Sequence, residues 1–131
     1  MGLNRIAVNY IILESGDRSS WPHAHSEQEE FLFILKGHGQ VWVDGNLYDV
    51  SEGDSIAFPP GTGITHCLIN NSENQLRLIV VGEQHVKSDK AFYAKHHKRN
   101  EEFKTMGVFW DNHPVHEMGQ HDSWPDKKRP K

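Results

Sequence analysis

The first 82 residues of this chain are short apolar segments separated by residues that favour turns, and this spacing restricts the fold more than any other feature. Each segment has the length of a β-strand, and no stretch before residue 84 has the period of an amphipathic helix. Asp44-Gly45 lies between two such segments and is a strong hairpin signal. Short strands at close intervals with Gly, Pro and Asn turns are typical of an all-β sandwich or barrel. We predict strands over residues 5–14, 30–36, 40–43, 47–50, 55–58, 64–69 and 76–81.

The sequence changes character after Gly82. Ser88-Asp89 is a candidate helix cap, because four residues at helical spacing follow it: Phe92, His96, Arg99 and Phe103. Beyond Gly107 the sequence is irregular, with Phe109-Trp110-Asp111 as a predicted anchor. We therefore expect a core domain over residues 1–82. We expect residues 83–131 to form an irregular, partly helical extension that packs on the core or on a partner subunit.

Composition excludes several classes of protein. A chain of 131 residues suits one domain, and a net charge of -4 gives no electrostatic case for nucleic acid or an anionic membrane. Cys67 is the only cysteine, so an intramolecular disulfide is impossible. No apolar run approaches the roughly 20 residues needed to span a bilayer, and no apolar signal segment stands at the N-terminus. These features predict a soluble, cytoplasmic protein.

Three histidines and a glutamate form a candidate metal site. His23 and His25 are two residues apart, so in a strand they project from the same face. Glu30 opens the next predicted strand and His66 lies in a later one, which lets them approach from other directions. Three imidazoles and one carboxylate suit one divalent ion of Mn, Fe, Co, Ni, Cu or Zn. Glu29 is the alternative to Glu30.

The chain resembles the cupin family at two motifs. The first is His-x-His, four residues, Glu, six residues and Gly; it covers residues 23–37, with Gly16 ahead of it. The second covers residues 53–70, and its turn from Gly61 to His66 is two residues longer than in the family pattern. The 15 residues between the motifs resemble the spacing of small microbial cupins. The resemblance extends over residues 5–82.

This resemblance implies a jelly-roll barrel, usually dimeric, with a metal ion in the barrel mouth. It also implies that His23, His25, Glu30 and His66 are the metal ligands. The function that we expect is a small-molecule metalloenzyme of oxygenase, isomerase or hydrolase type. A non-catalytic cupin that binds or stores a sugar-like ligand, and a cupin with a purely structural metal, are the alternatives.

Other residues bear on the chemistry. Cys67 follows His66 directly, so it should point away from the metal and behave as a small buried hydrophobe. Gln40 is a candidate polar contact in the cavity. Arg5 and Arg77 are the only arginines in the predicted strands, which argues against a carboxylate or phosphate clamp. Five late histidines are less suited to a second metal site than to a tail over the barrel mouth: His96, His97, His113, His116 and His121.

Overall fold

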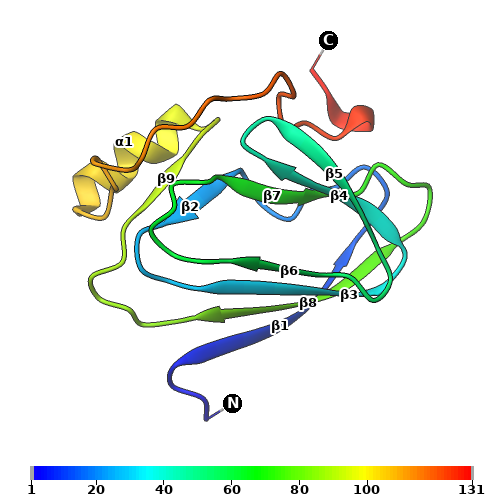
Figure 1. Cartoon of the computed structure of the whole chain (residues 1–131), viewed down its shortest axis with the longest axis horizontal. Coiled ribbons are helices and arrows are strands. Elements are labelled where there is room, and N and C mark those ends of the chain that lie inside the picture. Colours follow the sequence, from blue (N-terminus) through cyan, green and yellow to red (C-terminus); the bar gives the residue numbers. More distant parts are fainter. Residues whose placement is uncertain (1, 131) are drawn as a thin grey trace.

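The computed structural model describes residues 2–130, and two antiparallel β-sheets face each other within it (Figure 1). The four-stranded sheet contains, in order, β1 (Ile6–Leu13), β8 (Leu76–Glu83), β3 (Glu30–Lys36) and β6 (Ser55–Phe58). The five-stranded sheet contains, in order, β5 (Asn46–Ser51), β4 (His38–Val43), β7 (His66–Ile69), β2 (His23–His25) and β9 (Ala91–Tyr93). The jelly-roll fold expected of a cupin is therefore confirmed, but the two sheets do not close into a barrel.

The hydrophobic core fills the space between the two sheets. Strand residues alternate between the two faces of a sheet, so every second side chain of β3, β4 and β8 points inward. Ile34, Leu68 and Leu78 are fully buried there. Burial of a side chain of this size contributes about 1.5–3 kcal/mol. The core members are Leu13, Leu32, Ile34, Val41, Val50, Leu68, Leu76 and Leu78.

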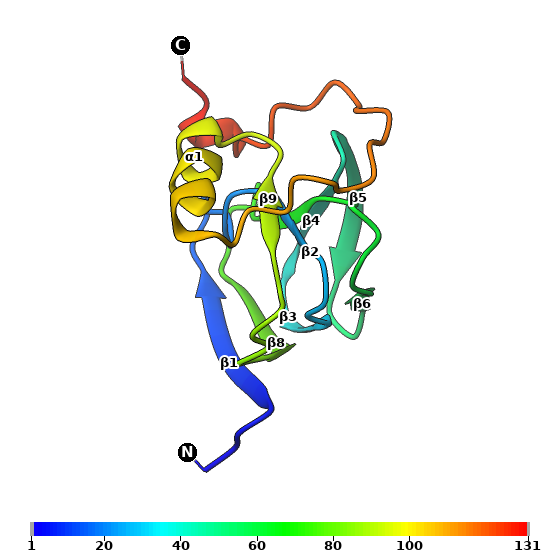
Figure 2. The ribbon, with the colours of Figure 1, turned by 90° about the vertical axis from the view of Figure 1, so that its left-hand side faces the viewer.

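The chain after residue 83 adds a strand and a helix to the outside of the five-stranded sheet. Strand β9 pairs with β2, and helix α1 (His97–Met106) follows it beside the sheet (Figure 2). The helix does not begin at Ser88-Asp89 as predicted. It begins after His96, whose Nδ1 accepts a hydrogen bond from the Arg99 amide at 3.1 Å, and it ends at Gly107 with φ of 75°. Within residues 2–130, neither the length nor the apolar content of any helix suffices to cross a membrane.

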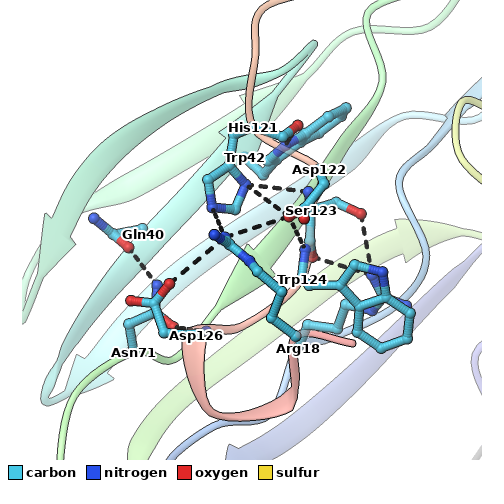
Figure 3. A network of polar contacts seen from close by, with 10 residues as sticks. Arg18, Gln40, Trp42, Asn71, His121, Asp122, Ser123, Trp124 and Asp126 are labelled. Atoms are coloured by element: carbon cyan, nitrogen blue, oxygen red, sulfur yellow. Dashed lines mark hydrogen bonds and ion pairs between the residues drawn. The ribbon is translucent and has the colours of Figure 1, made fainter. Parts of the chain in front are cut away.

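Residues 120–129, called the C-terminal strap here, lie over the outer face of the five-stranded sheet and end in the 3₁₀ turn η1 (Asp126–Lys128) (Figure 3). The Trp42 Nε1 group donates a hydrogen bond to the His121 carbonyl at 3.0 Å. The Arg18 guanidinium lies 3.8 Å from the Trp21 ring centroid and 4.3 Å from that of Trp124. These contacts bind the end of the described chain to the sheet.

Gln40 lies beneath the strap, so its predicted place in the cavity is wrong. Its Oε1 accepts a hydrogen bond from the Asn71 amide group at 2.8 Å, and Asn71 in turn accepts from the Asp126 backbone at 2.9 Å (Figure 3). Val41 points into the core, and alternation along β4 therefore turns Gln40 to the outer face.

Candidate metal centre

The four predicted ligands come from strands of both sheets. His23 and His25 share one face of β2, His66 opens β7 directly opposite His23, and Glu30 opens β3 in the other sheet. One ligand atom each of His23, His25 and Glu30 lies within 4.8 Å of the others. His66 is not part of that three-residue cluster, but its Nε2 lies 3.6 Å from Glu30 Oε1. His23 Nε2 lies 3.9 Å from Glu30 Oε2.

A small pocket joins His66 to the cluster. It has a volume of about 10 Å³ and is lined by His25, Glu30 and His66 among others. Such a volume is close to the least that holds one water molecule. His66 is 5% exposed, and its Nε2 has no hydrogen-bond partner among the described residues. An orphaned buried nitrogen facing a carboxylate across a space of this size fits a bound cation.

Each imidazole of the site has an acceptor at Nδ1. An oxygen of a carbonyl or a carboxylate can only accept, so each Nδ1 carries a hydrogen, and a neutral ring then offers a free lone pair at Nε2. Metal-binding histidines are held in this way by outer hydrogen bonds. The acceptors are the Trp21 carbonyl for His23 at 2.9 Å, the Asp89 carboxylate for His25 at 2.7 Å and the Ile64 carbonyl for His66 at 3.4 Å.

Asp89, which the sequence predicts as a helix cap, lies instead against the candidate metal centre. Its Oδ2 accepts from His25, and its Oδ1 accepts from the backbone amides of Glu27 at 2.9 Å and Gln28 at 3.1 Å. One carboxylate thus orients His25 and fixes the turn that leads into Glu30. Asp89 is 64 residues from His25 in sequence, and only the pairing of β9 with β2 brings them together.

The electrostatics of the site keep Glu30 ionised. Burial raises the pKa of Glu30, but its interactions with His23 and His66 outweigh burial and hold the pKa well below its usual range. Burial lowers the pKa of His23, yet the Glu30 carboxylate and the Trp21 carbonyl raise it above the usual value. Burial dominates at His66 and lowers its pKa. An ionised carboxylate beside three imidazoles favours the binding of a cation.

Packing holds the His66 ring in place. The Phe58 ring stacks on it with centroids 3.5 Å apart and an interplanar angle of 5°. Cys67 is 3% exposed and packs beside Trp42 on the other side of the sheet, away from the site as predicted. Burial raises the pKa of the Cys67 thiol to about 12, so it stays protonated at neutral pH. The thiol takes no part in the site.

A cavity of about 260 Å³ opens in front of His23, His25 and Glu30. Within residues 2–130, no arginine or lysine lines it. Apolar side chains of the inner sheet faces form another part of its wall. The polar and acidic lining comes from Asn9, Ser19, Ser20, Gln28, Glu29 and Glu83. Glu29, the alternative ligand, belongs to this wall and not to the histidine cluster.

The late histidines have separate partners. His96 caps α1, and His97 lies 3.8 Å from Glu101. His113 stacks on Phe92 at a centroid distance of 3.5 Å. The remaining contacts are His116 Nε2 to the Thr62 carbonyl at 2.6 Å and the Ser123 amide to His121 Nδ1 at 3.1 Å.

Comparisons with known proteins agree with the fold. Residues 9–82 match the family model described as Cupin domain. A crystal structure of a cupin-superfamily sugar phosphate isomerase from Silicibacter pomeroyi is 32% identical with a TM-score of 0.69, over 72% of this chain and 60% of that one. A candidate sugar phosphate isomerase from Acidithiobacillus ferrooxidans is 27% identical with a TM-score of 0.67, over 70% of this chain and 58% of that one.

An uncharacterized protein of Aquifex aeolicus is 32% identical over 62 residues, which is 47% of this chain and 50% of that protein. The chain thus covers less than two thirds of the length of each of these relatives.

Proposed function

This chain belongs to the Cupin domain family, and from that premise and the site geometry we propose that it is a metal-dependent enzyme that acts on a small molecule. One divalent ion would be held by His23, His25, Glu30 and His66. The main support is that three imidazoles, each hydrogen-bonded through its Nδ1 to a protein oxygen, surround one ionised carboxylate. The donor set suits Mn, Fe, Co, Ni, Cu or Zn.

The chemistry divides between the ion and the cavity. A bound divalent ion supplies Lewis-acid polarisation of a substrate oxygen. Asn9, Ser20 and Gln28 line the cavity and are suited to hydrogen-bond substrate hydroxyl groups. Leu32 and Val80 form an apolar part of the wall that limits the water beside a bound molecule.

The lining favours an uncharged, hydroxylated substrate. Two structural neighbours are named as sugar phosphate isomerases, which makes isomerisation of a sugar-like molecule the first reaction to test. Among the described residues that line this cavity there is no arginine or lysine to bind a phosphate, and the carboxylates of Glu29 and Glu83 would repel one. We therefore propose an unphosphorylated polyhydroxy compound as the substrate class. The cytoplasmic location and the homodimer expected from the sequence belong to this proposal.

Metal analysis of the purified full chain tests the ligand assignment. Wild-type protein should retain about one equivalent of a divalent ion, and Glu30→Gln should lose most of it. Glu29→Gln is the matched control, because it removes the neighbouring carboxylate and should keep the ion. Full occupancy in Glu30→Gln would overturn the assignment.

A turnover screen tests the activity. Wild-type protein should interconvert an unphosphorylated aldose or ketose, and removal of the ion should abolish the reaction. Preference for phosphorylated sugars would contradict the substrate class. Tight binding of a sugar without turnover would favour the non-catalytic binding cupin. Retention of the ion with neither binding nor turnover would favour a structural metal.

A further inference from the structure

A second cavity, called the outer cavity here, has a volume of about 260 Å³ and lies outside the five-stranded sheet. Phe92 lines it and pairs with Ala24 of β2. Ala24 lies between the two histidines of β2, so this pair points to the opposite face of the sheet, away from the candidate metal centre. Residues 108–119 run over that face and cover the cavity (Figure 1). Among residues 2–130, the outer cavity shares no lining residue with the cavity in front of the metal ligands, so the two are separate.

A buried carboxylate lines the outer cavity. Asp44 is 8% exposed, and its Oδ1 accepts hydrogen bonds from the Thr65 amide at 2.8 Å and the Thr65 hydroxyl at 2.7 Å. Among residues 2–130, the other oxygen, Oδ2, has no hydrogen-bond partner but is not fully covered. No cationic side chain in the same range lies within 4.0 Å of this carboxylate. Oδ2 can therefore accept a hydrogen bond from a molecule in the cavity, and a cation there would compensate the buried charge.

Two histidines of the covering segment add further acceptors to the cavity wall. His113 Nδ1 lies 3.1 Å from the Pro114 carbonyl oxygen, and His116 Nε2 lies 2.6 Å from the Thr62 carbonyl oxygen. A carbonyl oxygen can only accept, so these two nitrogens carry hydrogen, and each neutral ring keeps a lone pair on its other nitrogen. Asp44, His113 and His116 thus each offer an acceptor, and a molecule that binds to them has to donate hydrogen bonds.

The geometry of these acceptors favours an organic cation over a metal ion. In the described part of the chain, the candidate metal centre is the one place where three such side chains bring their ligand atoms within 4.8 Å of one another. The acceptors of the outer cavity therefore do not converge on one ion. Much of the remaining wall is apolar, formed by Phe92, Ala94, Pro114, Val115 and Met118. Such a wall is suited to contact the hydrocarbon part of a ligand.

We propose that the outer cavity is a second ligand site, and that it binds a small organic ammonium ion. The ammonium group donates a hydrogen bond to Asp44 Oδ2, and the hydrocarbon part lies against the apolar wall. A hydrogen bond between two charged groups is about twice as strong as one between neutral groups. The same carboxylate repels an anion, and a neutral molecule would leave its buried charge without compensation. The site is independent of the reaction proposed for the metal centre.

Calorimetric titration of the full chain with phenethylammonium and hexylammonium tests the proposal. Both probes should bind, and 2-phenylethanol, which has the shape of the first without its charge, should bind at least about tenfold more weakly. Asp44→Asn should weaken binding of the ammonium probes by about tenfold or more, because it removes the charge. This variant keeps an oxygen for Thr65 and creates Asn-Gly, a favoured hairpin turn, so it should fold. Asp111→Asn is the matched control, because Asp111 is an exposed carboxylate of the covering segment that does not line the cavity.

Nuclear magnetic resonance of the wild-type chain locates the bound probe without any substitution. On titration with phenethylammonium, the amide signals of Thr65 and Val115 should shift, whereas that of His25 should not. Glu30→Gln should bind the probe as the wild type does, so failure of the metal assignment and failure of this proposal are distinguishable. The proposal would be overturned if neither ammonium probe bound, if 2-phenylethanol bound equally well, or if Asp44→Asn and Asp111→Asn had equal affinities. Shifts at His25 in place of Thr65 would also overturn it.

Discussion

At the scale of single residues, Asp89 determines how His25 faces the site. Asp89→Asn keeps the shape of the side chain but removes the charge of the carboxylate, whose Oδ2 accepts the hydrogen bond from His25 Nδ1 at 2.7 Å. We expect the affinity for Zn²⁺ or Mn²⁺ to fall by about 10–100-fold, as it does when other carboxylates that hydrogen-bond a metal-binding histidine are changed. Isothermal titration calorimetry measures this. Asp54→Asn is the control, since Asp54 fixes only the exposed turn at Ser51. Equal affinity in the two variants would refute the role of Asp89.

The pKa of His23 makes the stability of the metal-free protein depend on pH. A histidine whose pKa is raised by folding stabilises the protein below its unfolded pKa, about 6.5, and this contribution is lost as the pH rises through the folded pKa. Because Glu30 raises the pKa of His23, wild-type protein in EDTA should lose stability as the pH rises above about 6.5. Urea denaturation of Glu30→Gln should show no such loss. The same slope in both proteins would contradict the pairing.

At the scale of elements, Arg18 links the C-terminal strap to the segment before β2. Its Nη1 donates to the carbonyl and the hydroxyl of the fully buried Ser123, at 3.0 and 3.1 Å. Arg18→Met leaves those groups without this donor and should lower the free energy of unfolding by about 2 kcal/mol. Arg99→Met, on the exposed helix α1, alters a cation–π contact with Tyr93 of β9 and should lower the free energy of unfolding by less than about 0.5 kcal/mol. Equal losses in denaturant titrations would contradict a specific role for the strap.

The elements also show what the sequence could predict. Strands β3 to β8 carry their own signal, because short apolar segments of strand length end at Gly, Pro, Asn or Asp-Gly turns. Strand β9 has three residues, and its conformation depends on its pairing with β2. Phe92 stands at helical spacing from His96, which led to the incorrect helix start. Local sequence therefore predicts elements that are stable through their own pattern, and not those that exist through a distant partner.

The same distinction applies to the site. His23, His25 and Glu30 share a local motif, so their gathering could be predicted. The Asp89 carboxylate has no such signature, because the fold alone brings it to the His25 imidazole. The open sandwich in place of a closed barrel likewise depends on how the sheet edges meet.

At the scale of the whole molecule, the candidate site spans both sheets. Glu30 belongs to the four-stranded sheet and the three histidines to the five-stranded one, so a bound ion would join the two layers. Strand β2 pairs with β7 through one residue pair, His23 with His66, so the two strands are weakly paired at the site. A ligand that binds only the folded state, at a concentration a thousand times its dissociation constant, raises the free energy of unfolding by about 4 kcal/mol.

Removal of the ion with EDTA should therefore lower the melting temperature of the wild type by on the order of 10 °C. Hydrogen exchange should rise first in β2 and at the start of β3, where the two layers would be released from each other. Glu30→Gln should melt at one temperature with or without the ion, because it lacks the ligand from the second sheet. Glu52→Gln, in an exposed turn, should respond as the wild type does. A shift of the same size in Glu30→Gln would mean that the ion is held by the histidine sheet alone and does not join the layers.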